Sequence, residues 1–451
     1  MDLTSRLRSI VRPQNSPPRE LTYEPDTGRY EASIDVDRMA DVLGGQVVTN
    51  RFGRALVIDR RYESDRFHGS RRVGECEVPD GDTLRLLDPT LPVPDGARDR
   101  TLFVDLETTG LSGGAGTVAF LVGCGWFDMG AFQVRQFLLT SYASERALLD
   151  AVASCFDAAS LLVTYNGKTF DVPVMETRWS FHRMRMSLES VRHFDMLHPA
   201  RRLWSSRSVD ASGVSLNNDS GGCRLGTLER VLCDVTRVGD VPGLEIPGRY
   251  FQFLRTGDAR PLEPVLEHNR LDLISLAAVA AHAVQLVEEG TPRCRDAAEA
   301  LALGRVYERA GCIDRALDAY RCAADDGSAH VDVQAEAIYR LGVRFRRDRR
   351  FNEAAGCWRR LLELPVPPRP KYSYAGQGSA LLAPLRQYAV QALAIHHEHR
   401  ARDYEGAKEL ALQLLEDSEE SGLRVTAEAT RHRLARLEKK IAQKNDSHLF
   451  G

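Results

Sequence analysis

Two acidic residues interrupt an apolar segment near residue 105. The stretch TLFVDLETTGL covers residues 101–111, and Asp105 and Glu107 stand one residue apart within it. Residues two apart on a β-strand point to the same face of the sheet, so a strand here would place these two carboxylates side by side. Adjacent carboxylates repel each other unless a cation lies between them. A lone D-x-E is a weak signal, because an exposed edge strand with solvated acids has the same pattern.

Two later segments carry acidic residues in comparable settings. VTYNGKTFDVPVMETR, residues 163–178, places Asp171 just after a second apolar, strand-like run. VLEHNRLDLISLAAVAAH, residues 265–282, carries His268 and Asp272 in a helical pattern. These two residues are four apart, so they share one face of the predicted helix.

The acids of the three segments together predict a site for hard divalent cations. They are Asp105, Glu107, Asp171 and Asp272. Carboxylate oxygens suit Mg²⁺ or Mn²⁺ rather than zinc, and four negative charges balance two such ions. Two divalent cations can activate a water molecule and stabilise the leaving oxygen when a phosphodiester is hydrolysed. His268 is the candidate base for this water, although an isolated histidine at a helix start is more often a capping or core residue.

The surrounding pattern predicts an α/β domain. Between residues 100 and 290, strand-like and helix-like segments alternate. The first three strand-like segments, 101–107, 116–128 and 131–140, are close enough in sequence to form an antiparallel meander. Residues 1–99 are mixed in pattern with proline-rich ends, which indicates an N-terminal arm or a small accessory domain.

Residues 291–445 contain an internal repeat. Two copies fit the tetratricopeptide spacing L-G-x-x-Y…A-x-x-x-F: Leu303-Gly304, Tyr307, Ala316 and Tyr320, then Leu341-Gly342, Phe345, Ala354 and Trp358. A third, weaker unit keeps Ala407 and loses the Leu-Gly pair. Small residues let paired helices approach closely, and aromatic side chains fill the space between stacked pairs. Generic amphipathic helices are the alternative. A repeat module of this kind predicts a protein partner.

Composition sets few limits on function. The chain has 451 residues, which favours two or three domains, and a formal net charge of -3, so nucleic-acid contact requires a local patch. Nine cysteines without a C-x-x-C pair indicate neither a disulfide framework nor a zinc site. The opening MDLTSRLRSIVRPQNSPPRE has no signal-peptide core, and we expect no membrane span and a cytoplasmic location.

The acidic segments resemble those of the DEDD superfamily of 3′→5′ exonucleases, which share the ribonuclease H-like fold. The matching motifs are FVDLETTGL, TYNGKTFDVPVM and EHNRLDLISL. Their combination with a repeat tail resembles the YprB-type ribonuclease H-like proteins of bacteria. The resemblance covers residues 100–290 and extends to the tail. It implies a ribonuclease H-like α/β nuclease domain, a mixed sheet flanked by helices, followed by an all-α tetratricopeptide-like domain.

The resemblance also implies roles for individual residues. Asp105 and Glu107 would hold a pair of Mg²⁺ or Mn²⁺ ions that Asp171 and Asp272 complete. The terminal nucleotide would meet Thr108, Thr109, Gly110 and Leu111. One departure concerns the last motif. In the superfamily a histidine commonly stands five residues before the final aspartate and a tyrosine four before it, whereas here His268 has the spacing of the tyrosine.

The resulting hypothesis is a metal-dependent 3′→5′ exonuclease acting on a single-stranded 3′ end of DNA or RNA. Asn166 and Lys168 are candidates for substrate contact, although a turn is the ordinary role of asparagine in YNGK. One alternative is a non-catalytic nucleic-acid-binding adaptor, although clustered negative charge would weaken a surface that only binds phosphates. A structure-specific endonuclease with the same metal ions is the other alternative.

Overall fold

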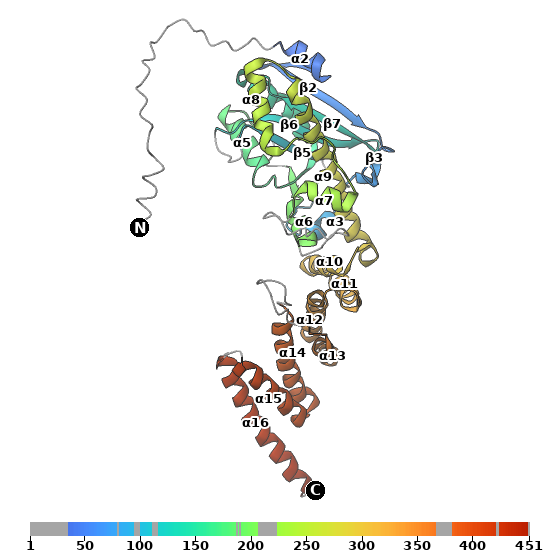
Figure 1. Cartoon of the computed structure of the whole chain (residues 1–451), viewed down its shortest axis with the longest axis vertical. Coiled ribbons are helices and arrows are strands. Elements are labelled where there is room, and N and C mark those ends of the chain that lie inside the picture. The colour runs from blue at the N-terminus through green and yellow to red at the C-terminus, as the bar shows by residue number, and fades with distance from the viewer. Residues whose placement is uncertain are drawn as a thin grey trace, which may run out of the picture.

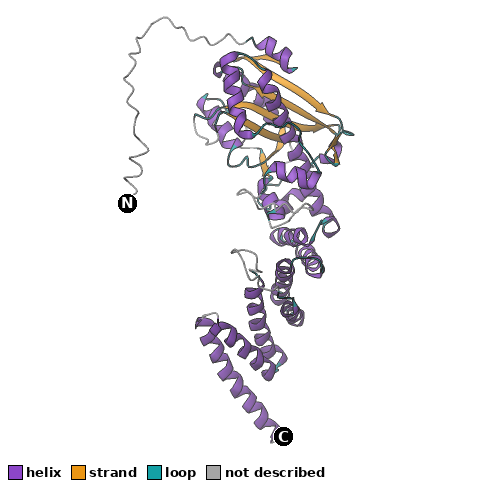
Figure 2. Cartoon of the chain, viewed as in Figure 1, coloured by secondary structure: helices purple, strands orange, loops and turns teal. Residues whose placement is uncertain are grey.

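The computed structural model describes residues 35–78, 81–93, 100–110, 116–185, 188, 191–205, 223–366, 381–420 and 424–449. An α/β body is followed by a column of helices that leads away from it (Figure 1). Figure 2 shows that the strands gather in the α/β body and that the column is helical. Both parts agree with the fold predicted from the sequence.

A mixed sheet of 7 strands forms the centre of the α/β body, in the order β1-β2-β7-β6-β5-β8-β9. Its strands are β1 (Gln46–Asn50), β2 (Gly53–Tyr62), β5 (Arg100–Thr108), β6 (Ala119–Asp128), β7 (Ala131–Leu138), β8 (Ala159–Thr164) and β9 (Arg192–Asp195). A separate hairpin joins β3 (Phe67–His68) and β4 (Arg71–Arg72). β5, β6 and β7 form the predicted antiparallel meander, and β8 and β9 run parallel to β5.

Helices cover both faces of this sheet. They are α2 (Val36–Leu43), α3 (Asp82–Leu87), α4 (Glu145–Asp157), α5 (Asp171–Phe181), α6 (Leu197–Trp204), α7 (Leu225–Cys233), α8 (Ile246–Thr256) and α9 (Glu263–Glu289). Alternate residues of β5 belong to opposite cores. Leu102 and Val104 pack in the cluster that includes α4, α5 and α8, whereas Phe103 packs with α6, α7 and most of α9. The central strand β5 is therefore buried on both faces.

The N-terminal part of the chain contributes to the same sheet. β2 pairs antiparallel with β7 from Leu56 to Tyr62, and β1 pairs with β2 at the sheet edge. This differs from the N-terminal arm or accessory domain expected for residues 1–99. The physical reason is that the β2 side chains Leu56, Val57 and Ile58 are buried in the hydrophobic cluster that α4 and the strands β6 and β7 also form.

α9 is the longest helix of the α/β body. Its length and apolar composition would let it cross a membrane, but 78% of its most apolar window is buried inside the protein. Leu273 and Ile274 pack in the core, and nearly every residue from there to Val287 is buried. α9 therefore serves as a core helix, and it carries the last acidic motif to the centre of the sheet.

The helical column consists of helices paired along the chain. They are α10 (Ala297–Arg309), α11 (Ile313–Asp325), α12 (Val331–Arg347), α13 (Phe351–Glu363), α14 (Leu382–His396), α15 (Tyr404–Glu420) and α16 (Arg424–Leu449). A Cβ at Gly304 would lie 2.4 Å from the Tyr320 ring, and one at Gly342 would lie 2.5 Å from Trp358. Glycine thus permits the close approach expected from the repeat pattern. Membership of the tetratricopeptide class stays a prediction.

One hydrophobic cluster runs from the sheet into the column. Trp204 is fully buried, and its Nε1 donates a hydrogen bond of 2.7 Å to Glu299 of α10. The Tyr307 hydroxyl donates to the Val287 carbonyl oxygen at 2.9 Å. The boundary expected near residue 291 is therefore crossed by packed side chains, and we expect the two parts to stabilise each other.

Candidate active site

Asp105 and Glu107 lie on the same face of the central strand β5. Both side chains are partly exposed, whereas Leu106 between them is buried. The pairing of β5 with β6 shifts register between Glu107 and Thr108. Irregularities of this kind re-aim side chains and are common beside active sites. The strand therefore presents two adjacent carboxylates at the point where its regular pairing ends.

Asp171 is the first residue of α5 and is 6% exposed. Burial raises the pKa of its carboxyl to about 7, although hydrogen bonds from its own N–H and from the Leu106 N–H act in the opposite direction. The contact with Leu106 ties the start of α5 to β5. The second acidic motif is thereby brought beside the first.

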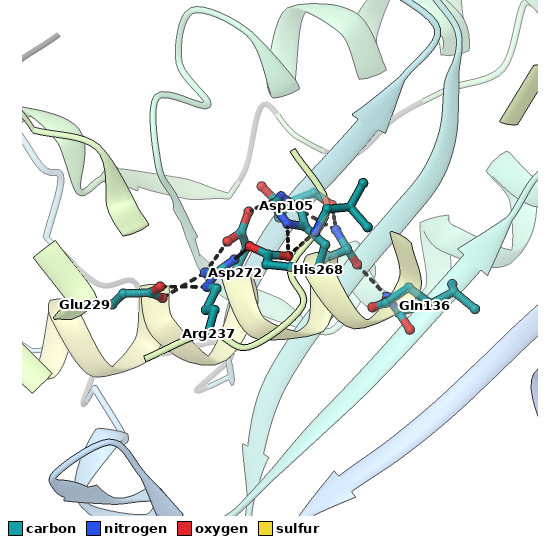
Figure 3. Close-up of polar contacts among 10 residues, drawn as sticks. Asp105, Gln136, Glu229, Arg237, His268 and Asp272 are labelled. Atoms are coloured by element: carbon teal, nitrogen blue, oxygen red, sulfur yellow. Dashed lines mark hydrogen bonds and ion pairs between the residues drawn. The ribbon is translucent and has the colours of Figure 1, made fainter. Parts of the chain in front are cut away.

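His268 and Asp272 reach the same region from α9 (Figure 3). Their i, i+4 spacing places the His268 Nε2 atom 3.5 Å from Asp272 Oδ2. The His268 Nδ1 atom lies 2.6 Å from Asp240 Oδ1, in the loop before α8. A carboxylate only accepts hydrogen bonds, so Nδ1 carries a proton and the ring is held with Nε2 directed toward Asp272.

The acids of the three motifs are close enough to affect one another. The pKa of Asp105 is raised well above its usual value, first by burial and then by the charges of Asp272, Glu107 and Asp171. The pKa of Glu107 is raised by burial, Asp272 and Asp171, with a further contribution from Asp240. A bound cation would relieve this mutual repulsion.

A buried amide network holds Asp105. Asn269, which is fully buried, donates a hydrogen bond of 2.7 Å to Asp105 Oδ2 and accepts one of 2.8 Å from Gln136. Asp105, Gly123 and Gln136 are aligned across β5, β6 and β7. Asn269 lies over Gly123, where a Cβ would be 2.2 Å from its Oδ1 atom. The absence of a side chain at residue 123 thus makes room for the residue that orients Asp105.

We expect Gly123→Ala to destabilise the protein by about 1–3 kcal/mol, because the added methyl group must displace Asn269 from its hydrogen bonds. The free energy of unfolding in urea measures the effect. Gly248→Ala is the matched control, since a Cβ there would meet open space. Equal unfolding free energies for Gly123→Ala and the wild type would contradict this role.

Arg237 is the cation nearest to the last acid. Its guanidinium donates to Asp272 at 2.6 Å, to Glu229 at 2.6 and 2.8 Å, and to Asp240 at 3.1 Å (Figure 3). Burial would lower the pKa of Arg237, but the hydrogen bonds and charges of Glu229 and Asp272 raise it. Asp272 is therefore neutralised by the chain itself in this conformation.

The four acids match a divalent-cation site in ligand type, since all four supply carboxylate oxygens from three motifs. In the conformation described, no three His, Cys, Asp or Glu side chains among the described residues converge closely enough to hold a metal ion. Asp272 instead pairs with Arg237 at 2.6 Å. The carboxylates are ligands of the type that binds a divalent cation. A change in the position of the Arg237 side chain would free Asp272, the last ligand.

The residues expected to meet the terminal nucleotide follow β5. Thr108 is 5% exposed, and its hydroxyl donates to the Gly110 carbonyl oxygen at 2.8 Å. The Thr109 hydroxyl accepts from the Val118 N–H at 3.1 Å. Both hydroxyls thus stabilise the chain around the bend, while Leu111 lies outside the described residues. Their contact with substrate stays a prediction.

Asn166 and Lys168 lie in the turn that leads to α5. Asn166 has a φ of 68°, and the buried Asp195 accepts hydrogen bonds from the N–H groups of Asn166 at 2.8 Å and Lys168 at 3.0 Å. The Lys168 ammonium pairs with Asp88 at 3.4 Å. Asn166 therefore has the turn role that its sequence context favoured, and substrate contact by either residue stays a prediction.

Several residues of this region were not identified from the sequence. They are Asn269, Gln136, Arg237, Asp240 and Glu229. Asn269 stands three residues before Asp272, so helical spacing contained a usable signal. Arg237 and Asp240 belong to the segment between α7 and α8, whose position depends on tertiary packing. No local sequence pattern indicates the position of that segment.

Comparisons with known proteins agree with this geometry. Residues 102–284 match the family model RNase_H_2, described as RNase_H superfamily. A Bacillus subtilis (strain 168) protein named "Uncharacterized protein YprB" is 31% identical over 362 residues, which are 79% of this chain and 78% of that protein. The region matched by the family model contains all four acids, Asp105, Glu107, Asp171 and Asp272. The chain therefore contains a domain of the RNase H superfamily and belongs to the family that includes YprB.

Proposed function

We propose that the protein is a 3′→5′ exonuclease that hydrolyses phosphodiester bonds of DNA or RNA with two divalent cations, Mg²⁺ or Mn²⁺. Membership of the RNase H superfamily supports a nuclease. The observation that carries the finer proposal is the mutual effect of Asp105, Glu107 and Asp272, which interact although they come from a strand and a distant helix. Acids that repel one another would also repel a phosphate. Such a cluster therefore suits phosphate chemistry only when it binds cations.

Asp105, Glu107, Asp171 and Asp272 would hold the two cations, which when bound stabilise the charge that develops on the phosphate and on the leaving oxygen. Asn269 keeps the Asp105 carboxylate in place through its hydrogen bond of 2.7 Å. His268 accepts the proton of the attacking water at Nε2, since its Nδ1 proton is held by Asp240. Asp240 thus acts as a positioning residue for the imidazole.

Substrate would approach along the end of β5. In this proposal Thr108, Thr109, Gly110 and Leu111 border the terminal nucleotide, and Lys168 and Asn166 lie on the side of α5. The Lys168 ammonium stands three residues before Asp171 and could exchange Asp88 for a phosphate oxygen. The proposed substrate is a single-stranded 3′ end, which would meet the end of β5. The proposed location is the cytoplasm.

A non-catalytic nucleic-acid-binding protein is the second candidate. It is favoured by the ion pair of Asp272 with Arg237, because a permanently neutralised acid would not serve as a metal ligand. In this candidate the RNase H-like domain grips nucleic acid and the helical column recruits a protein.

The experiment that separates the two uses purified protein and oligonucleotides of DNA and RNA, single- and double-stranded, labelled at either end. We expect nucleotides to be released stepwise from the 3′ end with Mn²⁺ or Mg²⁺ and none in the presence of a chelator. Internal cuts would indicate an endonuclease. Binding without cleavage under every metal condition would favour the second candidate.

A further inference from the structure

Arginines recur at one position of the helical column. Arg309, Arg347 and Arg400 each stand four residues before the first residue of the following helix, which is Ile313, Phe351 or Tyr404. The column therefore repeats one cation at the same turn of three successive helix pairs. All three residues are exposed.

The position two residues further along shows a second regularity. In the first turn it is Gly311, with a φ of 80°, which glycine adopts without strain. In the next two turns it is Arg349, with a φ of 61°, and Arg402, with a φ of 55°. A residue with a Cβ atom at positive φ costs conformational energy, and such residues concentrate at functional sites. Two units thus carry an exposed arginine where glycine would be the less strained residue.

The helix pairs that carry these turns pack against one another. α10 and α12 are joined by the ion pair of Arg340 with Glu308, at 3.0 Å. The Arg400 guanidinium lies 3.9 Å from the centre of the Phe351 ring, which brings the third turn against the second. The second and third turns are therefore neighbours, and the first turn belongs to a helix pair that packs against theirs.

Three acidic residues near the turns are already engaged by other groups, whereas the exposed Asp314 and Glu405, at the start of α11 and α15, form no ion pair within the described residues. Their pairs are Asp348 with Arg344 at 2.8 Å, Asp403 with His397 at 2.8 Å, and Glu398 with Arg433, Arg436 and Lys440 at 2.8–3.0 Å. Within the part of the chain that the structure describes, Arg309, Arg347, Arg349 and Arg402 form no ion pair. The turns consequently carry a local excess of positive charge in a chain whose formal net charge is -3.

Further cations lie between the first of these turns and the candidate active site. Arg202 of α6 donates a hydrogen bond of 2.7 Å to the Leu87 carbonyl oxygen, and its pKa is lowered by burial and then by the nearby charge of Arg309. Asp88, which follows Leu87 in the chain, pairs with Lys168. Lys168 stands three residues before Asp171. Cations thus connect the start of the column with the turn that carries the second acidic motif.

We propose that the edge formed by Arg309, Arg346, Arg347, Arg349, Arg400 and Arg402, here called the arginine edge, binds the phosphate backbone of a nucleic-acid strand that extends from the nuclease domain. The link to catalysis rests on the proposed nuclease function, whereas binding at the edge does not. A phosphate backbone is the partner that fits, because it supplies one negative charge at every step along a row of cations. The column then holds the substrate rather than a protein partner.

The test measures binding of labelled single strands by the full chain carrying Asp105→Asn, so that cleavage does not interfere. The edge variant is Arg309→Glu/Arg347→Glu/Arg400→Glu. The control, Arg38→Glu/Arg51→Glu/Arg255→Glu, makes the same charge change at exposed arginines of the α/β body. The probes are strands of about 40 and about 6 nucleotides, respectively longer than and within the usual range of about 4–16 nucleotides for one binding domain.

We expect the edge variant to bind the long strand at least tenfold more weakly, and the slope of log K against log salt to fall by about 2, since each single-strand phosphate contact contributes about 0.7. The control variant should keep wild-type affinity, and the short strand should bind all proteins alike. Arg349→Gly/Arg402→Gly provides a second variant that does not threaten folding. It should weaken binding of the long strand while raising the thermal midpoint, because it removes two strained residues.

Unchanged affinity of both edge variants for the long strand would overturn the inference. Tighter binding of polyglutamate than of the long strand at equal charge concentration would overturn it as well, because it would identify a surface for an acidic protein. If the wild type cleaves nothing but the edge variants still lose the long strand, the binding inference stands and only the proposed nuclease function fails.

Discussion

Asp105→Asn is expected to reduce phosphodiester cleavage at least about a thousandfold, because a bound cation contributes several kcal/mol of charge stabilisation to phosphoryl chemistry. Asparagine has the same shape as aspartate, and its amide oxygen can still accept the hydrogen bond from Asn269. The fold should therefore remain intact. The metal-free variant should have an equal or higher thermal midpoint than the wild type, since the repulsion of Asp105 with Glu107 and Asp272 is removed.

Three measurements distinguish this result from a general loss of protein. The thermal midpoint is recorded with a chelator and with Mn²⁺, and Mn²⁺ should stabilise the wild type more than the variant. Asp128→Asn, at the exposed end of the neighbouring strand β6, is the matched control and should keep wild-type cleavage. Wild-type cleavage by Asp105→Asn would remove the basis for a metal site at these acids.

Local pattern was sufficient for most of the sheet. β5, β6 and β7 have alternating or continuous apolar runs that are separated by short turns, so their antiparallel pairing follows from the sequence. The place of β2 could not be predicted in the same way. Its partner β7 is distant in the chain, and only burial of both strands against a common core decides the pairing.

The candidate site shows the same division. The spacing of Asp105 with Glu107, and of His268 with Asp272, is fixed by strand and helix geometry and could be predicted. That Arg237 would neutralise Asp272 could not, because the segment between α7 and α8 acquires its position from packing. The polar residue Gln136 within a buried strand was a signal of another kind. A buried amide requires a partner, and here that partner orients the metal-binding candidate Asp105.

His268 is expected to have the second-largest effect on catalysis. If its Nε2 atom accepts the proton of the attacking water, His268→Ala should lower turnover by about 10²–10⁴, the usual contribution of a general base. Stabilisation by Mn²⁺ should be nearly unchanged, because the four carboxylates remain. The exposed His432, on α16, supplies the control substitution His432→Ala, which should leave turnover at the wild-type value.

The contact with Asp240 gives the sharper form of this prediction. Asp240 accepts the Nδ1 proton of His268 at 2.6 Å, so Asp240→Ala should let the ring turn and lower turnover by about 10–100-fold, as loss of an orienting partner commonly does. In the double variant Asp240→Ala/His268→Ala, the two losses should not multiply, because Asp240 acts on the water through the imidazole. His268→Tyr should keep more activity than His268→Ala, since a phenol hydroxyl at the spacing of the superfamily tyrosine can still hold the water. Full additivity in the double variant, or wild-type turnover of His268→Ala, would make the histidine a structural residue and leave activation of the water to the cations.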